Sequence, residues 1–326
     1  MIDLEACARS LVAPGKGILA CDERIETINA RLEEAGIEPS EQVRLAYRTL
    51  LLETPGIEEY LSGVSLPEEL LASFAKSLHD RNIVPGVKAH EGYEAMSESP
   101  KEEVTKGLIG LQERLAEYRR LHHTGFATWR APVHIYGDQL PTSLCIVENA
   151  KRLAMHARYV QETGMVPIVE FDILRDGTHS RVRAKAVTLE ALSALVRALE
   201  DQSLDLSGVL LEVSMVLSGK ESGHLDSPEE AAHDTLDVFE GAIPKNLLGL
   251  ACFSKGQTPD QDTDTFRAVV QEGKKRKVPW PISFACSNTL EAEALSIWGG
   301  EASNVEAARE AFLARLRKVA LAARGE

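Results

Sequence analysis

The sequence predicts a single α/β domain over residues 1–326, a (β/α)8 barrel of the TIM type. Eight short apolar runs alternate with long amphipathic stretches, and each run is apolar almost throughout. Strands of a parallel sheet are covered by helices on both faces, so they have no polar face. The chain has 326 residues, a length typical of such a barrel, and no linker or internal repeat interrupts the alternation.

The eight apolar runs have the length of buried strands. The expected strands are Gly17–Ala20, Leu61–Ser65, Val84–Lys88, Phe126–Val133, Val166–Glu170, Val209–Val213, Leu247–Phe253 and Ile282–Ala285. A doubly wound open sheet is the competing architecture, and it usually has a glycine-rich turn after its first strand. Here the first run continues into Cys21-Asp-Glu-Arg24, which contains no glycine, so the barrel is favoured.

Four of the connecting stretches carry clear helix signals. Ser40–Leu52 has apolar residues at helical spacing, and a helix that starts after Pro141 is expected to reach Glu162. Ser227-Pro-Glu-Glu230 has the pattern of a capping box with proline in the first helical position. A last helix, rich in alanine and leucine, is expected over about Val305–Arg324.

The composition excludes several classes of partner. The net charge of −14 argues against binding to nucleic acid or to an anionic membrane, but it allows a basic pocket for a small anion. The N-terminus does not resemble a secretory signal, and no stretch has the roughly 18 apolar residues of a membrane span. Five cysteines without C-x-x-C spacing suit reduced thiols. We therefore expect a cytoplasmic protein.

Polar and ionisable residues follow the expected strands at the ends where a barrel places its site. They are Asp22, Lys88, His90, Arg130, His134, Glu170, Asp172, Glu212, Ser214, Ser254-Lys-Gly-Gln257 and Cys286-Ser-Asn288. One acid at a strand end has a simple explanation as a helix cap. Burying charge at five or more strand ends costs several kcal/mol unless the charges are paired or used. A functional pocket is therefore favoured over a structural salt-bridge cluster.

Distinctive short segments occur along nearly the whole chain, at Leu11–Glu23, Ile25–Arg31, Gly86–Lys88, Trp129-Arg130, Glu148–Ala150, Gly164–Glu170, Ser254–Gln257 and Trp298–Gly300. Together these segments resemble the class I fructose-1,6-bisphosphate aldolase family. The resemblance implies the barrel fold and a mechanism in which a lysine on the sixth strand forms a Schiff base with the substrate ketone. It also implies a helper lysine, a proton-transferring glutamate and groups that hold phosphate.

The site residues implied by this resemblance are only partly present. Those retained are Asp22, Arg31, Lys88, Arg130, Glu170 and Ser254, while Asp172 stands in place of a second glutamate. The Schiff-base lysine corresponds to Glu212, the helper lysine to Thr128, and a phosphate-binding arginine to Asn288. A carboxylate cannot form a Schiff base, so we expect negligible cleavage of fructose 1,6-bisphosphate.

The preferred hypothesis is an aldolase-like enzyme with altered chemistry on a small polar or phosphorylated carbonyl or hydroxy compound. The expected acid–base residues are Asp22, Lys88, Glu170, Asp172 and Glu212. The expected substrate-binding residues are Arg31, Arg130, Ser254, Lys255, Gly256 and Asn288. Crowded carboxylates should leave one carboxyl protonated near neutrality, which suits a general acid. We expect no cofactor and no metal, and a homo-oligomer, either a dimer or a tetramer.

Four alternatives stay open. The chain is either an enzyme or a catalytically inactive pseudo-aldolase that binds ligands or regulates. A second alternative moves the Schiff base to Lys88, with Arg130 lowering the pKa of its amine. A third is a cation site, either Mg²⁺, Mn²⁺ or Zn²⁺, although no local ligand motif supports it. Its ligands would be Asp22, Glu170, Asp172 and Glu212. The last makes Cys286 a nucleophile, although a buried cysteine more often acts as a small hydrophobe.

Overall fold

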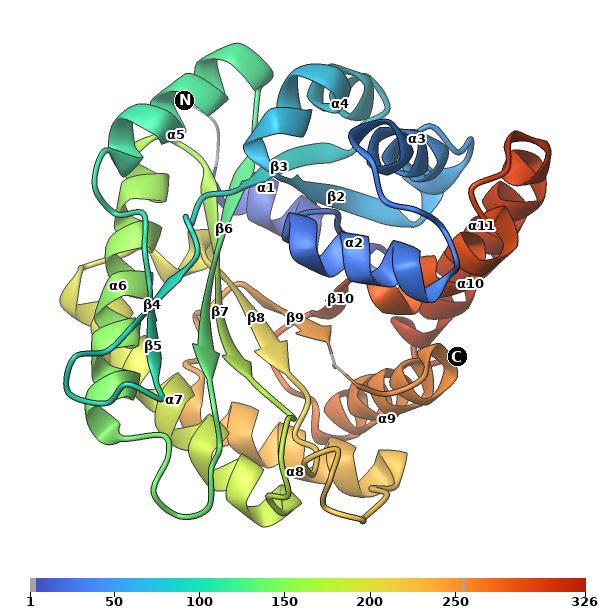
Figure 1. The fold of residues 1–326 in the computed structure, drawn as a ribbon. Helices are drawn as coiled ribbons and strands as arrows, with labels where there is room; N and C mark the ends of the chain where they lie inside the picture. Colours follow the sequence, from blue (N-terminus) through green and yellow to red (C-terminus); the bar gives the residue numbers. More distant parts are fainter. Residues whose placement is uncertain (1–3, 254–255) are drawn as a thin grey trace.

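The computed structural model describes residues 4–253 and 256–326, and its parallel strands close into a barrel wrapped by helices (Figure 1). Around the barrel the strands are β1 (Gly17–Ala20), β2 (Leu61–Leu66), β3 (Val84–Lys88), β6 (Phe126–Val133), β7 (Val166–Ile173), β8 (Leu210–Ser214), β9 (Gly249–Phe253) and β10 (Ile282–Cys286). Strand β10 pairs again with β1, which closes the circle. The predicted (β/α)8 barrel is confirmed. The main differences are that β7 continues past Glu170 and that β9 begins later than Leu247.

Helices cover the outer face of the barrel. They are α1 (Leu4–Leu11), α2 (Ile25–Glu34), α3 (Glu41–Leu52), α4 (Glu68–Asp80), α5 (Leu111–His122), α6 (Ser143–Glu162), α7 (Arg181–Asp201), α8 (Pro228–Ala242), α9 (Pro259–Arg276), α10 (Asn288–Trp298) and α11 (Val305–Ala322). The capping box predicted before α8 is present, because the Ser227 hydroxyl accepts from the Glu230 amide and the Glu230 carboxylate accepts from the Ser227 amide. The four helices predicted from sequence are confirmed.

The N-terminal end of the barrel is filled, which leaves the opposite end for a site. Leu11 and Val12, at the end of α1, join a buried cluster with barrel residues such as Phe126 and Ile168. A β-carbon on Gly86 would lie 2.2 Å from the Phe126 ring, so only glycine lets this ring pack across β3. This packing closes one mouth and directs access to the C-terminal ends of the strands.

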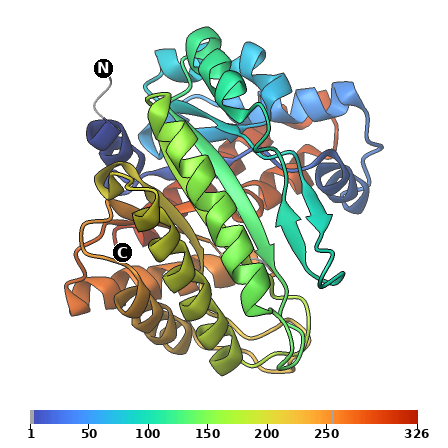
Figure 2. The ribbon, with the colours of Figure 1, turned by 90° about the vertical axis from the view of Figure 1, so that its left-hand side faces the viewer.

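A small antiparallel sheet outside the barrel was not predicted. Strands β4 (Tyr93–Ala95) and β5 (Glu103–Thr105) follow β3 and run beside β6 (Figures 1 and 2). Thr105 Oγ1 donates to the Arg130 carbonyl at 2.7 Å, and Asn149 Nδ2 of α6 donates to the Glu103 carbonyl at 2.8 Å. These bonds hold the small sheet at the rim of the barrel mouth. Within the described residues, no helix is both long and apolar enough to cross a membrane.

Candidate active site

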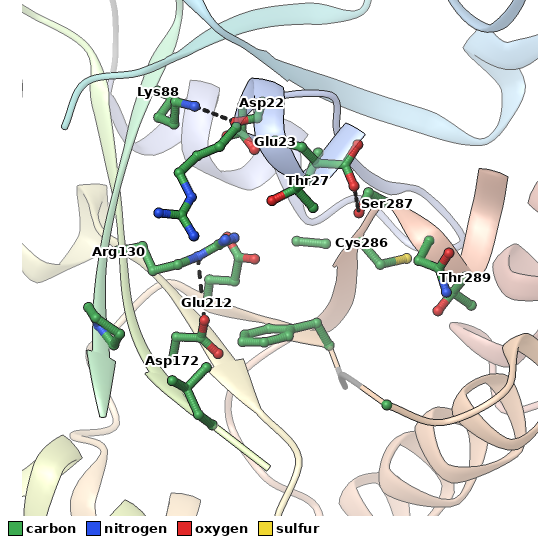
Figure 3. Close-up of a pocket in the computed structure, with 18 of the residues that line it drawn as sticks. Asp22, Glu23, Thr27, Lys88, Arg130, Asp172, Glu212, Cys286, Ser287 and Thr289 are labelled. Carbon is green, nitrogen blue, oxygen red and sulfur yellow. Dashed lines mark hydrogen bonds and ion pairs between the residues drawn. The ribbon is translucent and has the colours of Figure 1, made fainter. Parts of the chain in front are cut away.

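A cavity of about 590 Å³ opens at the C-terminal ends of the barrel strands (Figure 3). Of the site residues predicted from sequence, those that line it are Asp22, Arg31, Lys88, Arg130, Asp172, Glu212, Gly256 and Asn288. Glu170 lies deeper, in a chamber of about 20 Å³ that shares Asp22, Lys88, Arg130 and Glu212 with the cavity. Ser254 and Lys255 lie outside the described residues.

Three ionisable residues form one row across neighbouring strands. Arg130 on β6 is the register partner of Glu170 on β7, which is the register partner of Glu212 on β8. Side chains in register on parallel strands leave the same face of the sheet, here the inside of the barrel. Glu212 is only 7% exposed and the Glu170 side chain only 4%. The row therefore brings two buried carboxylates next to each other.

Arg130 is the cation that this row of carboxylates shares. Its Nε donates to Glu170 Oε2 at 2.5 Å. The same atom lies 4.0 Å from Asp172 Oδ2 (Figure 3). Burial lowers the pKa of Arg130, but the charges of Glu170, Asp172, Glu212 and Asp22 together raise it well above the usual value. Among the described residues, this one guanidinium therefore interacts with four acids at the cavity.

Asp22 and Lys88 meet on the neighbouring wall of the cavity. The Asp22 carboxylate accepts from Ser65 Oγ at 2.5 Å and from Thr128 Oγ1 at 3.4 Å. Lys88 Nζ donates to the backbone carbonyl of Asp22 at 2.5 Å (Figure 3). Thr128 therefore contacts the Asp22 carboxylate through its hydroxyl. The Lys88 amine is anchored at the cavity wall.

His90 is an uncharged polar group at this site. It stacks on Tyr93 of β4 with ring centroids 5.4 Å apart, and the Arg24 guanidinium lies 5.7 Å from the centroid of the same Tyr93 ring. Burial, followed by the charges of Lys88, Arg130 and Arg24, lowers the pKa of His90 to about 3. Its Nδ1 accepts from the Gly92 amide at 3.3 Å, so the proton of the neutral ring lies on Nε2. His90 is therefore a hydrogen-bond donor near neutral pH.

Arg31 is engaged by partners that the sequence analysis did not include. Its Nη1 donates to Glu23 Oε1 at 2.6 Å and to Glu291 Oε2 at 3.1 Å. Both acids come from segments around β1 and α10, and Glu291 is fully buried. Arg31 lines the cavity as predicted, but its charge is already paired.

Two of the open alternatives lose support. Burial, then the charges of Asp262, Glu212 and Glu291, raises the pKa of the Cys286 thiol well above its usual value, which argues against a thiolate nucleophile. Among the described residues, the group with metal-ligand spacing is His233, Asp234 and Asp237 on α8, and the acids at the barrel mouth do not form one. Asp234 and Asp237 are ion-paired to Lys185, so this exposed group is explained without a metal.

Comparison with known proteins gives the lineage of this barrel. The family model described as fructose-bisphosphate aldolase class-I matches residues 3–326. The chain belongs to this family. It is 38% identical to a probable fructose-bisphosphate aldolase class 1 from Xanthomonas campestris, over 99% of this chain and 98% of the relative. It is 36% identical to human fructose-bisphosphate aldolase B, over 99% of this chain and 90% of the relative.

A solved structure of an aldolase superposes on nearly the whole chain. It is fructose-bisphosphate aldolase from Plasmodium falciparum, with a TM-score of 0.94 and 33% identity over 99% of this chain and 94% of that one. The family resemblance read from the sequence is confirmed. This class I aldolase family member is, as expected, a protein of the lyase type.

Proposed function

We propose that this class I aldolase family member transfers protons on a small polar or phosphorylated carbonyl or hydroxy compound, without a Schiff base. The observation that supports this most strongly is the row of Arg130, Glu170 and Glu212 across β6, β7 and β8. Two buried carboxylates side by side cannot both ionise freely, so the group tends to keep a proton. A retained proton at the cavity is what a general acid needs.

The neighbouring groups supply the other roles in the proposal. Glu170, held by Arg130, acts as the ionised base, and Glu212 holds the proton. Lys88 and the Nε2–H of His90 polarise the substrate carbonyl, which stabilises negative charge that develops on its oxygen. Asp22, oriented by Ser65 and Thr128, positions a substrate hydroxyl, and Asp172 at the end of β7 positions another. The residues predicted to hold an anion are Ser254, Lys255, Gly256 and Asn288, of which Gly256 and Asn288 line the cavity and the first two lie outside the described residues.

Cleavage of fructose 1,6-bisphosphate is predicted to be negligible, although the relatives carry that activity in their names. Glu212 cannot attack a ketone to form an imine, and Thr128 cannot replace a second amine. Loss of a covalent participant alone can cost about 10⁶-fold in rate. Schiff-base-dependent cleavage by the wild-type chain would contradict this proposal.

Solvent deuterium exchange tests the proposal without knowledge of the full reaction. Hydroxyacetone, dihydroxyacetone and dihydroxyacetone phosphate are incubated with the protein in D₂O, and exchange beside the carbonyl is followed by proton NMR. Glu212→Gln should slow the exchange at least about 100-fold, because a general acid is lost. Glu293→Gln, which removes an exposed carboxylate on α10, is the matched control and should leave exchange unchanged.

The same experiment separates the competing hypotheses. Borohydride added during turnover traps an imine, and a mass-spectrometric adduct on Lys88 would show that the Schiff base has moved there. Compounds that bind without exchange or turnover would favour a pseudo-aldolase. A cytoplasmic location and a homo-oligomeric state stay predictions, and light scattering on the purified protein tests the second.

A further inference from the structure

A buried cluster of two acids and two arginines lies behind one wall of the cavity. We call Glu23, Arg31, Arg48 and Glu291 the Arg31 cluster. Besides the two Arg31 bonds, Arg48 Nη2 donates to Glu23 Oε2 at 3.0 Å and Arg48 Nη1 donates to Glu291 Oε1 at 3.4 Å. The Tyr47 hydroxyl lies 3.3 Å from Glu291 Oε2. Each carboxylate thus contacts both guanidinium groups.

The cluster is largely buried, with Glu23 and Arg31 at the cavity wall. Burial raises the pKa of Glu291, and the charges of Arg31 and Arg48 counteract this effect. With both acids ionised, the four charges of the cluster sum to zero. The Glu291 side chain is 0% exposed, that of Arg48 5% and that of Arg31 12%. Burial lowers the pKa of Arg31, but Glu291 and Glu23 raise it above its usual value, so the guanidinium stays charged inside the cluster. Arg31 Nη2 is buried and has no hydrogen-bond partner among the described residues. Arg31 lines the cavity, but an anion that binds it has to compete with Glu23 and Glu291.

Glu23 also faces the cavity beside Arg31. Its Oε1 accepts from Ser287 Oγ at 3.5 Å, and Figure 3 shows this pair at the wall next to Cys286. An incoming phosphate would therefore meet a carboxylate beside the arginine. Among the described residues that line the cavity, six are Asp or Glu and four are Lys or Arg. A bisphosphate brings about three to four negative charges, which this lining does not balance.

We propose that Glu291 is a specificity-determining residue that closes the Arg31 end of the cavity to phosphate. It acts through Arg31, whose charge it cancels together with Glu23. The substrate is then a polyhydroxy compound with at most one phosphate. The end of this compound that lies against Arg31 is uncharged. This inference rests on the proposed function only in taking the cavity as the substrate site.

Binding of unreactive sugar alcohols tests this inference apart from any catalysis. Glucitol 6-phosphate and glucitol 1,6-bisphosphate lack the carbonyl needed for turnover, so calorimetry with them is independent of the exchange assay. Wild-type protein should bind the bisphosphate no more than about threefold tighter than the monophosphate. Glu291→Gln leaves the positive charge of Arg31 without one of its two carboxylate partners. The variant protein should therefore bind the bisphosphate at least about tenfold tighter than wild type does.

Three further variants make the result specific to charge at Arg31. Glu293→Gln on the same helix changes the net charge equally but should not alter binding. Glu291→Gln with Arg48→Met restores a neutral cluster and should behave like wild type. Glu23→Gln removes the other partner of Arg31 and should give the same gain, which keeps the test decisive if Glu291→Gln does not fold. Tight bisphosphate binding by wild type, or no gain in a folded Glu291→Gln or Glu23→Gln protein, would overturn the inference.

Discussion

Replacing Glu212 by glutamine should stabilise the fold while it removes activity. Glu212 and Glu170 are register partners on adjacent strands, and strands in a sheet lie about 4.8 Å apart. Two unit charges about 5 Å apart repel by ~3 kcal/mol at an effective dielectric constant of about 20. Arg130 and a retained proton offset part of this repulsion. We therefore expect Glu212→Gln to raise the free energy of unfolding by about 1–2 kcal/mol.

Urea unfolding followed by tryptophan fluorescence measures this change. Glutamine keeps the length and shape of the side chain, so no cavity is created and the slope against urea should stay constant. The exposed control Glu293→Gln should change the free energy by less than about 0.5 kcal/mol. A Glu212→Gln protein that is less stable than wild type by more than about 1 kcal/mol would refute the reasoning, because Glu212 would then be a stabilising ion-pair partner.

Three further predictions concern stability. Burial lowers the pKa of His156 to about 3, so below about pH 6 the unfolded chain binds a proton that the native state does not, and stability falls as pH falls. His156→Leu should reduce that slope by about 1.4 kcal/mol per pH unit in urea unfolding between pH 6 and 4.5. Arg48→Met leaves the buried Glu291 with one cation fewer and should cost about 3–5 kcal/mol in the same assay, and a loss below about 1 kcal/mol would contradict the ion-pair geometry. Gly86→Ala should lower the melting temperature by several degrees because its β-carbon overlaps Phe126, and an unchanged melting temperature would show that the ring can move.

The barrel could be predicted because its strands are apolar on both faces, but strand ends were less predictable. Strand β7 continues through Asp172 to Ile173, where a polar residue facing the cavity interrupts the apolar run. Strands β4 and β5 have three residues each, which is too short for alternation to be recognised. Their pairing is fixed by tertiary bonds such as Asn149 to the Glu103 carbonyl.

The candidate site, like the fold, could be predicted from the sequence only in part. The meeting of Arg130, Glu170 and Glu212 could be predicted, because strand position and the two-residue period place their side chains on the inner face. The pairing of Arg31 with Glu291 could not, since 260 residues separate the two and a lone glutamate in a helix usually faces solvent. The neutrality of His90 follows from burial, which no local pattern records.

The proposed roles of Glu212, Thr128 and Glu291 meet separate physical requirements. In the correspondence expected from the sequence, Glu212 stands in place of the amine needed for covalent chemistry, and Thr128 in place of a second amine, where its hydroxyl contacts Asp22. The proposed role of Glu291 is at the cavity wall beside Arg31, where its charge reduces the electrostatic attraction for a second phosphate. Glu212→Lys would place an amine opposite Glu170, but the cavity wall at Arg31 would still carry no net charge. On these proposals, chemistry and charge selectivity depend on different residues, so changing either one alone should leave the other in force.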